Sequence, residues 1–273
     1  MALFEVNSTT KISYEVFQNA VPTTTLFIHG NLASNRWWTP SIDLFKSKFA
    51  LAAKNEGSII CVEFRGCGNS SVPQSENAEN EITMQNLAND FILLVRSLKL
   101  APVNLVGHST GGLIAAMMLA MAPELFNKAY LLDPVGAEGV KFDQAMIKSF
   151  DQMKENKGLT GSIIGSTILN NDATSTFFND VIVEDAFKAV RAVGHLVLKA
   201  LDGLDVRQLL SSVQHPVLVV HGEKDQLLPM TESEKMAKLF KNGQFQILPG
   251  CGHCANIENP KLFTQSVSQF LFS

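Results

Sequence analysis

Hydrophobic residues along this chain come mostly in short runs, and eight of these runs have the character of β-strands. Several are almost continuously apolar, such as TTLFI at Thr24–Ile28 and VLVV at Val217–Val220, which is typical of strands buried on both faces of a sheet. In chain order, the predicted strands are Leu3–Val6, Lys11–Phe17, Thr24–Ile28, Ile59–Phe64, Val103–Val106, Ala129–Leu132, Val217–Val220 and Phe245–Leu248.

Helical periodicity fills several of the intervals between these runs. In Thr83–Leu98 the apolar residues fall on one stripe, as expected for a helix that packs one face on a sheet. The predicted helices are Thr83–Leu98, Leu113–Met121, Thr231–Phe240 and Leu262–Leu271. Strands that alternate with helices favour a mostly parallel sheet covered on both faces, so the predicted fold class is α/β.

One long stretch breaks this alternation. From Gly136 to Asp205 the pattern is helical, and no strand is predicted. Its apolar residues are too many for an exposed appendage, and they include Phe142, Met146, Phe150, Met153, Phe177, Phe178 and Phe187. We therefore expect a core formed by residues 1–135 and 206–273, and a helical cap of residues 136–205 that folds over the strand ends.

The composition of the 273-residue chain excludes several classes of protein. Hydrophobic residues make up 46% and charged residues 18%, which is enough apolar material for a large core, so wholesale disorder is excluded. The formal net charge is −4 and the basic residues are scattered, which argues against a nucleic-acid partner.

The same features bear on where the protein works. The first residues lack the pattern of a signal peptide, and the longest apolar stretch, Leu113–Ala122, is too short to cross a bilayer and reads as a buried helix. Four cysteines in a chain of this size do not make a disulfide framework. We expect a cytoplasmic protein without a membrane span.

The clearest chemical signal is GHSTG at residues 107–111, which follows the strand VNLV and opens the helix GLIAAMMLAMA. This is a G-x-S-x-G nucleophile elbow in the strand–turn–helix setting that the motif requires. A serine on a strained turn projects its hydroxyl away from the sheet, and the glycines leave room for neighbouring backbone. The alternative, an ordinary glycine-rich turn capped by a serine, accounts for less of this setting.

A nucleophilic serine needs a base, and the base needs an acid that orients it. Of the six histidines, His253 lies in PGCGH between the last predicted strand and the last predicted helix. Asp225 lies just past the strand VLVV. The order Ser109, Asp225, His253 is the chain order that an open α/β sheet of this kind imposes on a catalytic triad.

These motifs resemble those of the α/β-hydrolase superfamily, and the similarity runs over almost the whole chain, weakest in residues 136–205. The resemblance implies that Ser109 is the nucleophile, Asp225 the acid and His253 the general base. Gly252 and His253, followed by ENP at residues 258–260, are similar to the usual family ending around the histidine.

Two further segments carry the resemblance. HGN at residues 29–31 resembles the oxyanion loop of the superfamily, which implies that the backbone N–H groups of Asn31 and Thr110 face the oxyanion. RGCGNS at residues 65–70 resembles the R-G-x-G-x-S turn, with Glu63 where an aspartate is commoner.

Several other polar residues near these motifs have alternative roles. Asp133, at the end of its strand, is the rival acid because some superfamily members place the acid there, whereas the loop around Asp225 matches the commoner arrangement. His29 and His221 precede glycines at strand ends, so we predict structural hydrogen bonds for both. His108 is expected to pack or hydrogen-bond under the elbow.

The CGHC segment at residues 251–254 raises the alternative of a thiol redox site or half of a zinc site. A redox motif of this kind lies near the start of a thioredoxin-sized domain, whereas this one lies near the C-terminus without a second, suitably spaced pair. We therefore expect neither a metal nor an organic cofactor.

Together, the residues and the resemblance predict a serine hydrolase that cleaves a carboxylic ester of a small, fairly apolar substrate through an acyl-enzyme. A serine at position 109 argues against the dehalogenases and epoxide hydrolases of the superfamily, which use aspartate. The alternatives are a C–C bond hydrolase or lactonase with the same triad, and a ligand-binding protein with slow turnover. The elbow also resembles that of cofactor-free perhydrolases, although Asn31 stands where those commonly have an aromatic residue.

Overall fold

The computed structural model describes residues 1–49, 56–74, 76, 78–100 and 102–273. Its strands are β1 (Ala2–Glu5), β2 (Lys11–Val21), β3 (Thr25–Ile28), β4 (Gly57–Val62), β5 (Val103–His108), β6 (Phe126–Leu132), β7 (Pro216–Gly222) and β8 (Asn242–Leu248). They form one sheet in the order β1-β2-β4-β3-β5-β6-β7-β8. β2 pairs antiparallel with β1 and β4, and all the other pairs are parallel.

The two-residue period of the strands explains why the central ones are apolar at nearly every position. Along β3, Leu26 and Ile28 are buried on one face of the sheet and Phe27 on the other. The same alternation between two hydrophobic clusters runs through β4, β6 and β7. A strand that is covered on both faces must be apolar in both sets of positions.

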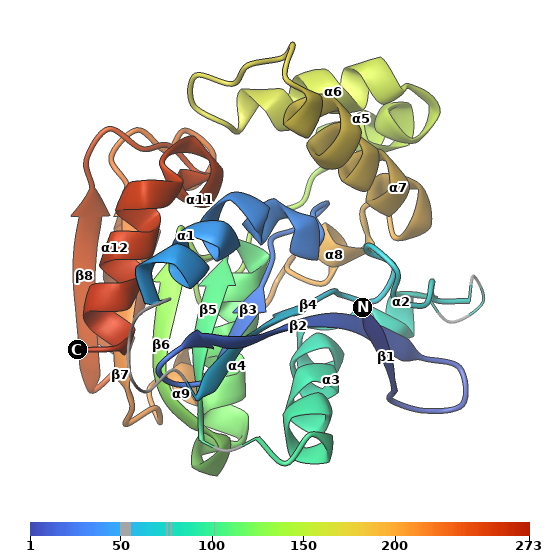
Figure 1. Cartoon of the computed structure of the whole chain (residues 1–273). Helices are drawn as coiled ribbons and strands as arrows, with labels where there is room; N and C mark the ends of the chain where they lie inside the picture. Colours follow the sequence, from blue (N-terminus) through green and yellow to red (C-terminus); the bar gives the residue numbers. More distant parts are fainter. Residues whose placement is uncertain (50–55, 75, 77, 101) are drawn as a thin grey trace.

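Helices cover both faces of the sheet (Figure 1). The helical elements are η1 (Asn35–Trp38), α1 (Thr39–Phe49), α2 (Ala78–Glu81), α3 (Met84–Ser97), α4 (Thr110–Met121), η2 (Pro123–Leu125), α5 (Gln144–Glu155), α6 (Lys157–Ser166), η3 (Phe178–Val183), α7 (Glu184–Ala192), α8 (Leu196–Lys199), α9 (Arg207–Leu210), α10 (Met230–Leu239), α11 (Ala255–Glu258) and α12 (Pro260–Leu271). On the Phe27 face, Phe45 of α1 and Phe263 of α12 are buried. On the opposite face, α3, α4 and α10 bury their apolar residues.

The α/β fold class is confirmed, and each of the eight predicted strands is present with boundaries shifted by a few residues. The largest shift is in β2, which continues across a bulge between Phe17 and Val21. The predicted helices correspond to α3, α4, α10 and α12. The sequence pattern does not predict α1, because Ile42 and Phe45 stand among polar residues and are buried only through packing on α12 and the sheet.

The apolar stretch Leu113–Ala122 forms most of the buried helix α4, as expected. Within the described ranges of the chain, no helix combines the length and the apolar character that crossing a membrane requires.

The stretch between β6 and β7 is described throughout, and it contains helices and no strand, as the pattern predicts. In Figure 1, α5, α6 and α7 form a layer beyond the carboxyl ends of the parallel strands. Apolar side chains of this segment, such as Met153, Ile164 and Val190, belong to the same hydrophobic cluster as Leu26 of the sheet. The helical segment of residues 136–205 is therefore packed onto the rest of the chain.

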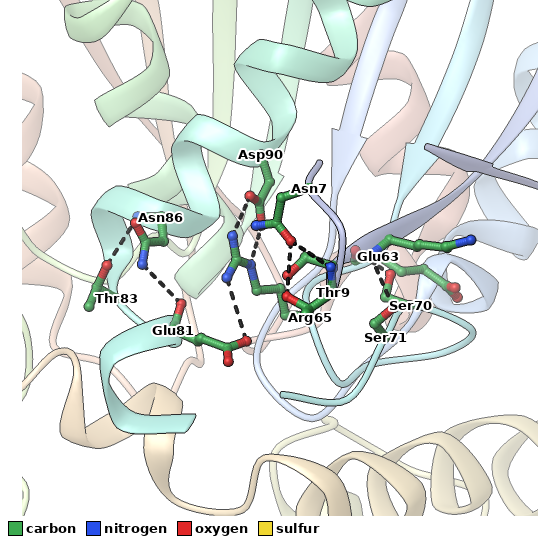
Figure 2. Close-up of polar contacts among 12 residues, drawn as sticks. Asn7, Thr9, Glu63, Arg65, Ser70, Ser71, Glu81, Thr83, Asn86 and Asp90 are labelled. Carbon is green, nitrogen blue, oxygen red and sulfur yellow. Dashed lines mark hydrogen bonds and ion pairs between the residues drawn. The ribbon is translucent and has the colours of Figure 1, made fainter. Parts of the chain in front are cut away.

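A buried ion pair ties the turn after β4 to α3 (Figure 2). Arg65 donates two hydrogen bonds to the two carboxylate oxygens of Asp90, at 2.6 and 2.7 Å, and its third nitrogen lies 3.8 Å from Glu81. Arg65 is 6% exposed and Asp90 is 1% exposed. Within the turn, the Ser70 hydroxyl donates to the backbone carbonyl of Glu63 at 2.8 Å, so the RGCGNS turn is held at both ends.

Asp90→Ala is expected to destabilise the fold by about 3–5 kcal/mol, because it leaves the Arg65 guanidinium buried and unpaired. Urea unfolding followed by circular dichroism measures this loss. The double variant Arg65→Met/Asp90→Leu removes both charges and is expected to be much closer to the wild type. An equal loss in the single and double variants would contradict the pairing.

Candidate active site

Ser109 lies on the tight turn between β5 and α4, with φ 54° and ψ −122°. A positive φ is costly for a residue with a side chain, and four backbone hydrogen bonds hold Ser109, one of them from the N–H of Leu113 at 3.3 Å. The Ser109 N–H donates to the Leu132 carbonyl of β6 at 2.9 Å, and the Ser109 carbonyl accepts from Gly112 and Val135 at 2.9 and 3.1 Å. The neighbouring strand and the turn after it therefore stabilise the elbow.

The two glycines of the elbow are required by close backbone contacts. A Cβ atom on Gly107 would lie 2.3 Å from the carbonyl oxygen of Gly111. A Cβ atom on Gly111 would lie 2.3 Å from the carbonyl oxygens of both Ile28 and His29. The two glycines of the G-x-S-x-G motif thus allow helix α4 to approach β3 and β5 this closely.

Asp225 and His253 come together from the loops after β7 and β8. His253 Nδ1 donates to Asp225 Oδ2 at 2.8 Å, and the other oxygen of Asp225 accepts from the N–H groups of Leu227 and Leu228 at 2.7 and 3.3 Å. Burial raises the pKa of Asp225, but the His253 hydrogen bond and charge and the two N–H groups outweigh it, so the pKa is lowered. With its proton on Nδ1, a neutral His253 has Nε2 free to accept a proton.

His108 connects the elbow to the loop that carries His253. Its Nε2 lies 2.9 Å from the His253 carbonyl oxygen, so Nε2 carries the proton and donates. Burial, followed by the charge of His253, lowers the pKa of His108 to about 3. The two imidazole centroids are 4.8 Å apart. His108 is therefore a neutral side chain, and its predicted role under the elbow is confirmed as a hydrogen bond to the backbone of His253.

The structure brings Asp225 and His253 into direct contact and places Ser109 next to them through His108. Across the described part of the chain, no hydrogen bond joins the Ser109 hydroxyl to His253. Such bonds often tighten only when substrate is bound. Ser109 is buried, with 9% exposure.

The predicted oxyanion donors lie beside the elbow. A Cβ atom on Gly30, which precedes Asn31, would lie 3.1 Å from Cβ of Ser109, so the loop after β3 borders the serine. Thr110 is the first residue of α4, and the N–H groups of a first helical turn have no partner inside the helix. The two segments thus offer backbone donors near Ser109 at the positive end of a helix dipole.

The hydrogen bonds predicted for His29 and His221 are confirmed. His29 Nδ1 donates to the Gly30 carbonyl at 2.7 Å, and its Nε2 accepts from the Phe64 N–H at 3.3 Å. Burial lowers the pKa of His29 to about 4, so the ring is neutral. His221 Nδ1 pairs with the Ser233 hydroxyl at 2.9 Å.

Asp133 is a second carboxyl group at this site. Its Oδ1 accepts from the Gly222 N–H at 2.7 Å, whereas Oδ2 is buried without a hydrogen-bond partner. Burial and then the negative charge of Asp225 raise the pKa of Asp133 well above its usual value. Burial thus disfavours a charge on Asp133, whereas the lowered pKa of Asp225 favours the negative charge that faces His253.

The side chains available for a metal or a redox group are few. Within the described residues, one group has three potential ligand atoms within 4.8 Å of one another, namely Asp133, Asp225 and His253. In this group, Asp133 accepts the Gly222 N–H and Asp225 accepts from His253, and the raised pKa of Asp133 disfavours the charged carboxylate that a metal ligand needs. Cys251 and Cys254 are free thiols, and burial raises the pKa of both, that of Cys251 to about 11, so neither is a ready thiolate.

A cleft of about 330 Å³ opens beside His253. One side is formed by residues 166–170 of the helical segment, and the other by Lys224, Gln226, Leu227 and Gly252 on the loops after β7 and β8. Its volume lies in the range of small-molecule sites. The sequence predicts a segment over the strand ends, but not which of its residues border the cleft next to His253.

A buried serine on a strained elbow, next to a His–Asp pair at the carboxyl edge of a parallel sheet, is the arrangement of a hydrolase. The sequence profile of the alpha/beta hydrolase family matches residues 25–265. The chain therefore belongs to the alpha/beta hydrolase family.

Three similar proteins are named as an esterase/lipase, a lactonase and a bromoperoxidase. A protein of Haemophilus influenzae that is provisionally assigned as an esterase/lipase is 27% identical over 230 residues, which cover 81% of this chain and 76% of that protein. The 3-oxoadipate enol-lactonase 2 of Acinetobacter baylyi is 22% identical over 267 residues, covering 94% and 91%. The crystal structure of a bromoperoxidase from Bacillus anthracis matches with a TM-score of 0.81 at 21% identity, covering 100% of this chain and 99% of that one.

Substituting Asp225 and Asp133 one at a time tests which of the two carboxyl groups acts on His253. Asp225→Asn is expected to lower kcat by about 10³–10⁴-fold, because the amide cannot hold His253 with its proton on Nδ1 and stabilise the charged imidazole. Asp133→Asn is expected to retain most of the wild-type kcat, because His253 Nδ1 bonds to Asp225 and the raised pKa of Asp133 favours a neutral side chain there. Steady-state kinetics of the two variants measures the difference, and the reverse ranking would identify Asp133 as the acid.

The raised pKa of Asp133 also predicts a pH dependence of stability. The native state holds a proton on Asp133 that the unfolded state releases above a pKa of about 3.9, so this group costs stability increasingly as pH rises through that value toward the native pKa. Asp133→Asn removes the penalty. The Tm of the variant relative to the wild type is therefore expected to rise between pH 4 and pH 8, and a difference that is constant with pH would contradict it.

Proposed function

We propose that the protein is a serine hydrolase that cleaves carboxylic esters of small, fairly apolar substrates without a cofactor. Ser109 is the nucleophile, His253 the general base and Asp225 the acid that orients it. The observation that carries this proposal is the 2.8 Å bond between His253 Nδ1 and Asp225. The backbone of His253 is hydrogen-bonded to His108, which directly precedes the serine held at φ 54°. The His253–Asp225 pair leaves Nε2 of His253 as the proton acceptor.

The proposed reaction has two steps. The Ser109 oxygen attacks the ester carbonyl carbon while His253 Nε2 takes the hydroxyl proton, and the N–H groups of Asn31 and Thr110 bind the oxyanion. The intermediate collapses to an acyl-enzyme, and His253 passes the proton to the departing alcohol. A water molecule that His253 deprotonates then attacks the acyl-enzyme, and the carboxylic acid is released as Ser109 regains its proton.

Residues 136–205 are the proposed cap of this enzyme. Helices α5, α6 and α7 lie beyond the carboxyl ends of the strands (Figure 1), and residues 166–170 border the cleft next to His253. Apolar residues of the segment, among them Ile168, are buried. We take the cleft of about 330 Å³ beside His253 as the space for an acyl group of modest size.

A lactonase is the second candidate, because the Acinetobacter baylyi relative with this activity aligns over 94% of the chain. A lactone is a cyclic ester, so the same serine, histidine and oxyanion donors would open it. The leaving alcohol then stays attached to the acyl group, and the acyl-enzyme is hydrolysed to a hydroxy acid.

Initial rates on p-nitrophenyl esters of graded acyl length test the proposal. The wild type is expected to show an optimum at a short acyl chain, because the cleft is small. Ser109→Ala is expected to lower kcat/KM by about 10⁴-fold or more, since it removes the nucleophile.

Ser211→Ala, at an exposed serine after α9, is the matched control and is expected to behave as the wild type. Lactones and a vinylogous diketone are assayed in parallel. Faster turnover of either substrate than of every ester would favour the lactonase or the C–C hydrolase. Ligand-induced stabilisation without turnover would favour a binding protein, and full activity of Ser109→Ala would exclude Ser109 as the nucleophile.

A further inference from the structure

Glu258, the last residue of α11, has a carboxylate that accepts three backbone hydrogen bonds from two separate parts of the chain. Oε2 accepts from the N–H of Gly252 at 2.5 Å, and Oε1 accepts from the N–H of Cys254 at 3.0 Å. Oε1 also accepts from the N–H of Leu169 at 2.9 Å. Hydrogen bonds to a charged acceptor are stronger than neutral ones.

Two of these bonds hold the residues on either side of His253. With the N–H groups of Gly252 and Cys254 on one carboxylate, both peptide units that flank the imidazole are fixed relative to α11. On the other side, His108 Nε2 holds the His253 carbonyl at 2.9 Å. The backbone of the base is thus held at three successive residues, and Glu258 supplies two of the three contacts.

The third bond reaches into the helical segment. Leu169 lies in the stretch 166–170 that borders the 330 Å³ cleft together with His253. A second cavity of about 300 Å³ is bordered by Leu169, Phe178 and Glu258. Leu169 therefore borders both cavities, and the Glu258 carboxylate holds its backbone N–H.

The three segments lie close together. A Cβ atom on Gly252 would lie 3.0 Å from Cβ of Leu169 and 3.0 Å from Oε1 of Glu258. The Glu258 carboxylate is therefore the polar group that both the 166–170 stretch and the loop of His253 share.

We infer that Glu258 is a positioning residue that couples the wall of the substrate cleft to the orientation of His253. Loss of its carboxylate loosens the base and the cleft wall together, whereas loss of the Leu169 N–H loosens the wall alone. The kinetic part of this inference rests on the proposed function.

The experiment compares two pairs of variants in the full-length protein. Glu258→Gln replaces one acceptor oxygen by an NH₂ group, which cannot accept from the facing N–H groups. Its matched control is Glu223→Gln, because Glu223 accepts the N–H of Gly250 in the same loop at 2.8 Å without touching His253 or the helical segment. Leu169→Pro removes the N–H of residue 169, and Leu169→Ala, which keeps it, is the reference.

Amide hydrogen exchange tests the coupling without any reaction. Glu258→Gln is expected to speed exchange in both 166–172 and 252–254, and Leu169→Pro, relative to Leu169→Ala, in 166–172 alone. Glu223→Gln is expected to leave both segments as in the wild type. Unchanged exchange of residues 166–172 in a folded Glu258→Gln protein would overturn the coupling, even where all the esters are hydrolysed as proposed.

Kinetics on the graded esters tests the consequence. Glu258→Gln is expected to lower kcat by about 10–100-fold, because small displacements of a base have effects of this size, and to flatten the preference for acyl length. Leu169→Pro is expected to flatten the preference relative to Leu169→Ala, with a smaller loss of kcat. A Glu258→Gln protein with a lower Tm but unchanged kcat and preference would reduce Glu258 to a structural role. If the wild type turned over none of the substrates while the variants showed the expected exchange pattern, the proposed function would be refuted and the coupling would stand.

Discussion

A serine held at φ 54° between a strand and a helix costs conformational energy, of order 1–3 kcal/mol for such backbone strain, and the surrounding chain must compensate for it. The compensation comes from backbone hydrogen bonds to β6 and to the turn after β6, so the elbow exists only when the sheet has formed. The glycines at 107 and 111 then let α4 approach β3. This approach places the N-terminus of α4 beside the loop after β3, where the oxyanion donors are proposed.

The two carboxyl groups at the site show how environment assigns different roles to one residue type. Asp133 receives one N–H, from Gly222, and has a buried oxygen without a partner, so burial raises its pKa. Asp225 receives two N–H groups and the His253 imidazole, which outweigh its burial. One negative charge in a buried site is easier to stabilise than two, and the pKa values of the two carboxyl groups are accordingly shifted in opposite directions.

The helical segment is attached to the rest of the chain at two sides of the site. At one side, Asp185 of α7 accepts from the Ser34 hydroxyl at 2.6 Å and from Arg36 Nε at 3.2 Å, and both donors follow the proposed oxyanion loop. At the other side, Leu169 donates to Glu258, next to His253. The segment thus contacts the chain just after the proposed oxyanion loop and the loop that carries His253. Polar contacts of this kind fix its position more sharply than apolar packing alone.

The sequence by itself determined the eight strands, because a strand buried on both faces must be apolar in both of its alternating sets of positions. It also determined the elbow, because glycine alone tolerates the backbone contacts at 107 and 111, and the places of Asp225 and His253 after neighbouring parallel strands. Only the tertiary structure decided the burial of α1, the raised pKa of Asp133 and the contact of Glu258 with Leu169. The last two residues are 89 positions apart, and burial and long-range contacts exist only once distant segments pack together, so no local pattern could encode them.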